Sequence, residues 1–232
     1  MPTLLVRCAG KKADGVVNSA SSMRAIGKVR REGAPVGIHV HTKLDEHGRR
    51  VFEDYFDRAE MLSRMKEARH RFLNAFGLDA RIFGMGNLAC SCEPVAGLPS
   101  TLGIELDIGD IISPKYLQNV YDYRSDSWRT DFPVFKHDIW WIPLGTDGIE
   151  GDQGRGWLGL WAKQDTSVCE GIFSRYRTIA ESNPHRLVVI SSVVHPPETL
   201  KLWDTWVDMH SIAKDNGVGS IASVQALDML RR

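Results

Sequence analysis

Short apolar runs alternate with helix candidates along most of this 232-residue chain. Runs of strand length lie at residues 3–8, 36–41, 81–83, 102–108, 139–144, 187–194 and 218–221. Helix candidates lie between them at residues 19–31, 51–76, 166–181, 198–216 and from about 222 to 230. Strands that alternate with helices are typical of parallel sheets, so the order predicts an α/β fold, either an open parallel sheet or a (β/α) barrel.

The organisation of the chain predicts a single domain over residues 1–232. We find no internal repeat, no low-complexity segment and no stretch rich in proline or glycine that would act as a linker. A length of this order also suits one α/β barrel.

The longest helix candidate, residues 51–76, carries apolar side chains at steps of three and four residues, and Gly77 is its expected end. These positions are predicted core, with no chemistry assigned to them: Phe52, Phe56, Ala59, Leu62, Met65, Phe72 and Phe76.

Composition narrows the class of protein. Hydrophobic residues make up 43% and charged residues 25%, which is typical of a soluble globular chain. The 29 basic and 29 acidic residues cancel, which argues against a broad electrostatic surface for nucleic acid or for a membrane. No apolar run reaches the roughly 18–20 residues that span a bilayer, and the amino-terminal segment lacks signal-peptide features, so we expect a cytoplasmic protein.

The stretch PVGIHVHTKLDEH, residues 35–47, is the first candidate site. Side chains two apart on a strand share a face, so His39 and His41 should point the same way where the strand ends. Neutral imidazole is the commonest nitrogen ligand of zinc, and the pair therefore predicts a divalent metal site, with zinc as the expected ion. The other interpretation is that histidines fall together here by chance.

Functional sites of parallel α/β folds lie beyond the carboxyl ends of the strands. The polar residues at these ends are His39, His41, Asp107, Asp110 and His195. Two or three of them would hold a metal, and another would act as acid or base on a water molecule, as in a metal-dependent hydrolase. Singly, each has an ordinary explanation, because aspartates form turns and a histidine before two prolines can simply end a strand.

Four segments follow one another in a characteristic order: VGIHVHT at 36–42, FGLDARIFGMGN at 76–87, LGIELDIGD at 102–110 and VVISSVVHPPE at 188–198. In order and spacing they resemble motifs of the polysaccharide (NodB-like) deacetylase family. The resemblance implies a distorted or incomplete (β/α) barrel that removes an N- or O-acetyl group from a sugar or oligosaccharide with the help of a metal.

Roles for the candidate residues follow from the same resemblance. His39 and His41, with Asp107 as a further candidate ligand, would hold the metal. Asp107 or Asp110 would take a proton from water, and His195 would protonate the leaving amine. The amino-terminal strand departs from the family, since it reads LLVRCAG and lacks the aspartate pair found there. The barrel would therefore be shortened at its amino terminus and its site rebuilt.

Two alternatives remain. The strings HVHT at 39–42 and GIELD at 103–107 also resemble the polymerase-and-histidinol-phosphatase (PHP) family of metal phosphoesterases, and a deacetylase-like chain without catalysis would be a binding protein. A phosphoesterase site should gather lysine and arginine at the strand ends. A sugar site should gather aromatic side chains, for which the candidates are Trp128, Trp140, Trp141, Trp157 and Trp161.

Overall fold

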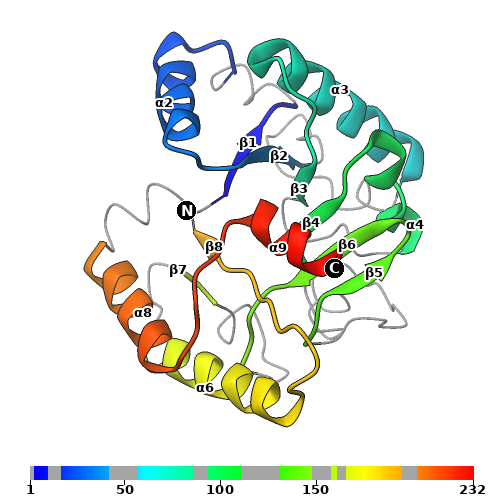
Figure 1. Cartoon of the computed structure of the whole chain (residues 1–232). Coiled ribbons are helices and arrows are strands. Elements are labelled where there is room, and N and C mark those ends of the chain that lie inside the picture. The colour runs from blue at the N-terminus through cyan, green and yellow to red at the C-terminus, as the bar shows by residue number, and fades with distance from the viewer. Residues whose placement is uncertain are drawn as a thin grey trace. The chain divides into compact units, whose positions relative to one another are not determined.

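The computed structural model describes residues 3–9, 17–41, 57–85, 93–110, 131–147, 158–160, 166–194 and 203–232 (Figure 1). The first half holds β1 (Leu4–Arg7), α2 (Ala20–Arg31), β2 (Val36–Val40), α3 (Arg58–Phe76), β3 (Ile82–Met85), α4 (Glu93–Ala96), the 3-10 helix η3 (Ser100–Leu102) and β4 (Leu106–Asp110). The second half holds β5 (Val134–Lys136), β6 (Ile139–Pro143), β7 (Gly159–Leu160), α6 (Thr166–Ser182), β8 (Val193–Val194), α8 (Trp203–Asp215) and α9 (Ser223–Leu230).

The chain divides into two compact units, each described by itself. Unit 1 comprises Met1–Asp110, Phe135–Trp141 and Ile221–Arg232, and unit 2 comprises Ile111–Val134 and Ile142–Ser220. The prediction of one domain over the whole chain stays a prediction. No helix in the described ranges is both long enough and apolar enough to cross a membrane.

A six-stranded sheet with the order β1-β2-β3-β4-β6-β5 organises unit 1. Strands β1 to β4 pair in parallel. Strands β5 and β6 are joined by His137 and Asp138, which both have positive φ (56° and 60°). A two-residue loop with this geometry is a type I′ turn and joins antiparallel strands. The sheet is therefore mixed, and over the described residues it is not closed, which confirms the predicted α/β fold.

Local sequence explains where α2 and α3 begin and end. The hydroxyl of Ser19 caps α2 by accepting from the amide of Ser22 at 3.4 Å. The carboxylate of Asp57 caps α3 by accepting from the amides of Ala59 and Glu60 at 2.8 and 3.0 Å. Gly77 ends α3 at a φ of 65°, where a side chain would be strained. The predicted helix began at residue 51, but residues 51–56 lie outside the described part.

Helix α3 packs against β2, the strand that carries the histidine pair. Met61, Met65, Ala68 and Phe72 on α3 are fully buried. On the β2–β3 side a glycine is required, because a Cβ at Gly37 would lie 2.5 Å from a backbone oxygen of the neighbouring strand. The strand that presents the pair is thus held by a packed helix on one side and a close backbone contact on the other.

Unit 2 is built around α6 and α8, which pack together. Their core contains Leu158, Cys169, Ile172, Phe173, Tyr176 and Met209. Strands β7 and β8 pair in parallel, and Leu144 forms an isolated parallel bridge with Ser191.

Several strand predictions need correction. β5 was not among the predicted strands, because its turn uses His137 and Asp138 in place of the usual Asn-Gly and gave no sequence signal. Of the strand predicted at 102–108, the first residues are not extended, because η3 runs into Gly103 at a φ of 72°. The apolar run 187–194 is paired only at its end, and residues 218–221 form no strand.

Candidate functional site

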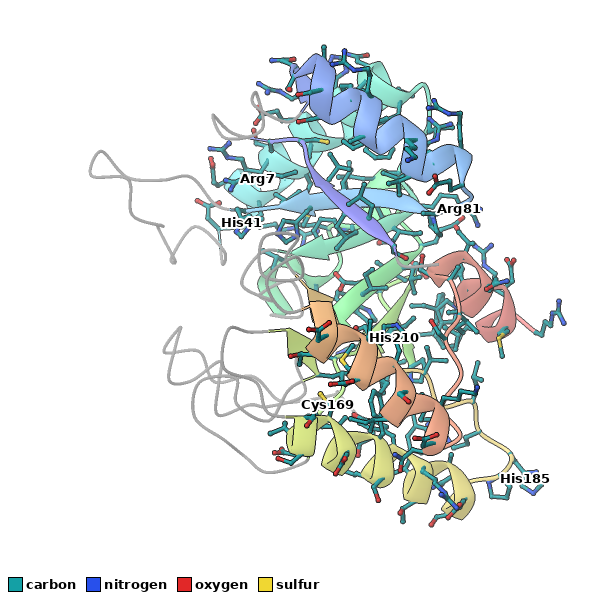
Figure 2. All side chains as sticks on the ribbon, turned by 90° about the vertical axis from the view of Figure 1, so that its left-hand side faces the viewer. Arg7, His41, Arg81, Cys169, His185 and His210 are labelled. Atoms are coloured by element: carbon teal, nitrogen blue, oxygen red, sulfur yellow. The ribbon has the colours of Figure 1, made fainter. Side chains whose placement is uncertain are left out.

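The histidine pair lies at the carboxyl end of β2, as the sequence predicted. His39 is the fourth residue of the strand and His41 follows its last residue. Figure 2 shows Arg7 and His41 near the same end of the strands, with Arg81, which precedes β3, at the other end. Both histidines are half-buried.

The orientation of His39 is set by the neighbouring strand. Its Nδ1 lies 2.8 Å from the carbonyl oxygen of Gly84. A carbonyl can only accept, so Nδ1 carries the proton and donates it to Gly84. In the neutral ring this leaves the lone pair on Nε2. A hydrogen bond from the ring nitrogen that does not bind the metal is the usual way in which proteins fix the tautomer of a metal-binding histidine.

The two rings meet through their outer nitrogens. Nε2 of His39 lies 2.9 Å from Nε2 of His41, and the rings are nearly perpendicular, with centroids 4.6 Å apart and an interplanar angle of 87°. Without a metal, His41 would donate a proton to His39. Two nitrogen ligands of a tetrahedral zinc lie about 3.3 Å apart, given Zn–N bonds of about 2.0–2.1 Å. The pair therefore fits a shared metal after a movement of a few tenths of an ångström.

A complete metal centre is not formed by the described residues alone. Within these ranges, no three His, Cys, Asp or Glu side chains come together in a way that could hold a metal ion. The pair would supply two ligands. Further ligands would come from water or from residues that the structure does not describe. Residues 42–56 and His195 are among these.

The strand register separates Asp107 from the pair. Asp107 is aligned with Phe83, and Phe83 with Ile38, one row before the row that contains His39 and Gly84. Side chains of consecutive rows leave opposite faces of a sheet. The buried Asp107 carboxyl, 2% exposed, therefore leaves the face opposite to that of His39.

Asp110 and His195 complete the predicted set. Asp110 is the last residue of β4. The side chain of Asp110 lies outside the part of the structure that is described. His195 lies outside the described residues, immediately after β8. Of the predicted residues, the structure thus brings His39 and His41 into contact and assigns Asp107 to the opposite face.

Arg7 was not predicted from the sequence. It is the last residue of β1 and is aligned with His39 on the neighbouring strand, so both lie in one row. Neighbouring strands are about 4.8 Å apart, which places a half-buried guanidinium beside the histidine pair. The only sequence signal was its position at the end of an apolar run.

Trp140 and Trp141 have structural roles. Trp141 is 1% exposed, and its indole nitrogen donates to the carbonyl of Lys136 at 2.9 Å. Trp140 packs on Phe135 with ring centroids 5.3 Å apart. Trp128, Trp157 and Trp161 lie outside the described residues. Of the two discriminating features, an arginine at the strand ends is present in the described part, and an aromatic cluster is not.

Cys8, which follows Arg7, is a buried thiol without a reactive role. Burial raises its pKa to about 12, against a smaller lowering by Arg71. The thiolate is the nucleophile and the metal ligand, so at neutral pH this side chain is neither.

Comparisons with known proteins identify no family. No protein-family model matches the chain, and no curated protein matches it. A solved structure that matches is the GH57-type branching enzyme from the hyperthermophilic archaeon Pyrococcus horikoshii, with a TM-score of 0.45 and 11% sequence identity over 94% of this chain. The match covers 49% of that enzyme, so the chain spans about half of its length. A likeness at this level assigns neither a family nor an activity to the chain.

Proposed function

We propose that the chain is a metal-dependent hydrolase whose zinc ion is held by Nε2 of His39 and Nε2 of His41. One observation carries the proposal: Nδ1 of His39 is bound to the carbonyl of Gly84, and its Nε2 faces that of His41 at 2.9 Å. This is the arrangement of ligand and orienting partner that metal sites use, and it lies at the carboxyl edge of parallel strands.

Each residue of the chain has a separate task in this proposal. The metal would supply Lewis-acid chemistry, polarising a carbonyl or phosphoryl oxygen and acidifying a water molecule. The Gly84 carbonyl holds the proton on Nδ1 of His39, which keeps Nε2 unprotonated and makes it a stronger base. Asp110, the last residue of β4, would take a proton from the attacking water, and His195 would give one to the leaving group.

A sugar deacetylase is the reaction that we favour. The support is the order of the segments around His39, Phe83, Asp110 and His195, which resembles the NodB-like deacetylases, shortened at the amino terminus. In such a reaction water attacks the acetyl carbonyl, acetate is released, and the amine or hydroxyl of the sugar takes up a proton.

Arg7 favours a second candidate, a metal-dependent phosphoesterase. A guanidinium matches a phosphate with two parallel hydrogen bonds, and Arg7 lies in the same strand row as His39. Nothing in a neutral acetylated sugar requires a cation at this place. A phosphoester or another anionic substituent would be bound there.

An activity screen tests the proposal. We expect the purified protein with added zinc to hydrolyse either acetylated chito-oligosaccharides, measured as released acetate, or a panel of sugar phosphates, measured as released phosphate. His39→Ala should lower the rate of hydrolysis at least about a hundredfold, because a metal ligand is lost.

Arg7→Met distinguishes the two reactions. It should raise KM for a phosphorylated substrate and leave deacetylation nearly unchanged, because only the anion needs the guanidinium. Hydrolysis that survives chelation of all metal and the loss of His39 would contradict both candidates.

A further inference from the structure

Helix α2 carries a concentration of positive charge in a chain that is neutral as a whole. Its 12 residues include Arg24, Lys28, Arg30 and Arg31 and no acidic residue. Cations in a last turn stabilise the helix dipole, and this accounts for the three later positions. It does not account for Arg24, which lies a full turn earlier.

Three of these cations form one exposed row, which we call the basic face. Arg24, Lys28 and Arg31 are spaced i, i+4 and i+7, so they lie within an arc of about 60° on the helix surface and span about 10 Å. All three are exposed. Arg30 points elsewhere, since it donates to the carbonyl oxygen of Phe76 at 3.3 Å.

The basic face differs from the cations of the neighbouring helix α3. There Arg64 pairs with Glu60, Arg69 with Asp79, and Arg71 with Glu67. In the part of the chain that the structure describes, Arg24, Lys28 and Arg31 form no ion pair. Three arginines of α3 are thus ion-paired, whereas the row of three cations on α2 is not.

We infer that the basic face binds the phosphodiester backbone of a nucleic acid, without reading its sequence. Arginine and lysine are the usual partners of backbone phosphates, and contacts of this kind position a protein without specifying bases. The zero net charge of the chain excludes a broad footprint, but a local row needs only three cations.

A membrane surface fits the same helix less well. Helices that lie in a membrane interface bury large apolar side chains beside their basic ones. On α2 the apolar Ile26 is 7% exposed, within the core of unit 1, and the exposed uncharged residues are the small Ala20, Ser21 and Ala25. Nothing on this face would insert among lipid chains.

Salt-dependent binding to DNA is the test. We would follow the fluorescence anisotropy of a labelled duplex of about 20 base pairs with the full chain, between about 20 and about 200 mM salt. Three phosphate contacts predict a slope of about −2.7 for log K against log salt, and Kd near tens of micromolar at about 20 mM. Arg24→Gln/Lys28→Gln/Arg31→Gln should lose more than about a hundredfold in affinity at low salt.

A matched variant controls for net charge. Arg69→Gln/Arg177→Gln/Arg231→Gln removes the same three charges from arginines that are ion-paired with Asp79, Glu181 and Glu105, and it should keep most of the affinity. Circular dichroism would show that both variants fold. The inference is overturned if the two variants weaken binding equally, if the wild type shows no binding at about 20 mM salt, or if it binds only vesicles with about 30% anionic phospholipid and no DNA.

Discussion

Under the proposed hydrolase function, exchanging Asp110 for asparagine should lower the rate of hydrolysis by about 10²- to 10⁴-fold, the usual contribution of a positioned general base. Asparagine keeps the size of the side chain but cannot take a proton at neutral pH. The substitution should leave zinc binding and the melting temperature nearly unchanged. Steady-state kinetics on the substrate found by the screen, with metal content measured on the same preparations, would check both statements.

Asp107 provides the matched comparison, because the same exchange is made three residues away on the same strand. Its buried carboxyl is assigned to the opposite face by the register with Phe83 and Ile38. Asp107→Asn should therefore change the free energy of unfolding and leave kcat within a few-fold of the wild type. A large loss of kcat in Asp107→Asn, with an active Asp110→Asn, would contradict the role that we propose for Asp110.

Replacing Phe72 by alanine should destabilise the protein by about 3–5 kcal/mol, because it leaves a cavity in the core between α3 and the sheet. Phe72 is fully buried, and its ring packs on Phe76 with centroids 4.8 Å apart. The same helix holds β2 and with it the histidine pair. Urea unfolding followed by circular dichroism would measure the loss of stability.

Leu73, the next residue of the same helix, is the control for the effect of alanine on helix propensity. It is 41% exposed, so Leu73→Ala should change the free energy of unfolding by no more than about 0.5 kcal/mol. If the two variants were equally stable, the packing of α3 in unit 1 would not be as the structure has it.

Helices were the predictable part of this fold because their signals are local. The candidate helix at 19–31 begins at the capping Ser19, and Gly77 ends α3 as expected. Apolar spacing was a weaker guide to burial. Met65 and Phe72 are core as predicted, whereas Ala59 is exposed, because it lies in the first turn of α3, next to the capping Asp57. Strand pairing depends on distant residues, and so the β-branched run at 187–194 misled the prediction.

The candidate site was predictable only where two residues lie on one strand. The spacing of His39 and His41 is enough to place them on one face. That Asp107 leaves the other face depends on the register of two strand pairs, and the contribution of Gly84 is a backbone carbonyl, which no side-chain pattern reveals. Arg7 joins the row through pairing with a strand about 30 residues away in the sequence.

Metal content is the most direct test of the account. We would measure zinc, iron, nickel and cobalt by elemental analysis in the wild type and in His39→Ala/His41→Ala, after loading with metal and removal of the excess. We expect about one metal ion per folded chain in the wild type and none in the double variant. Both imidazoles are needed to complete a site of about four ligands. Equal metal content in the two proteins, or none in either, would contradict it.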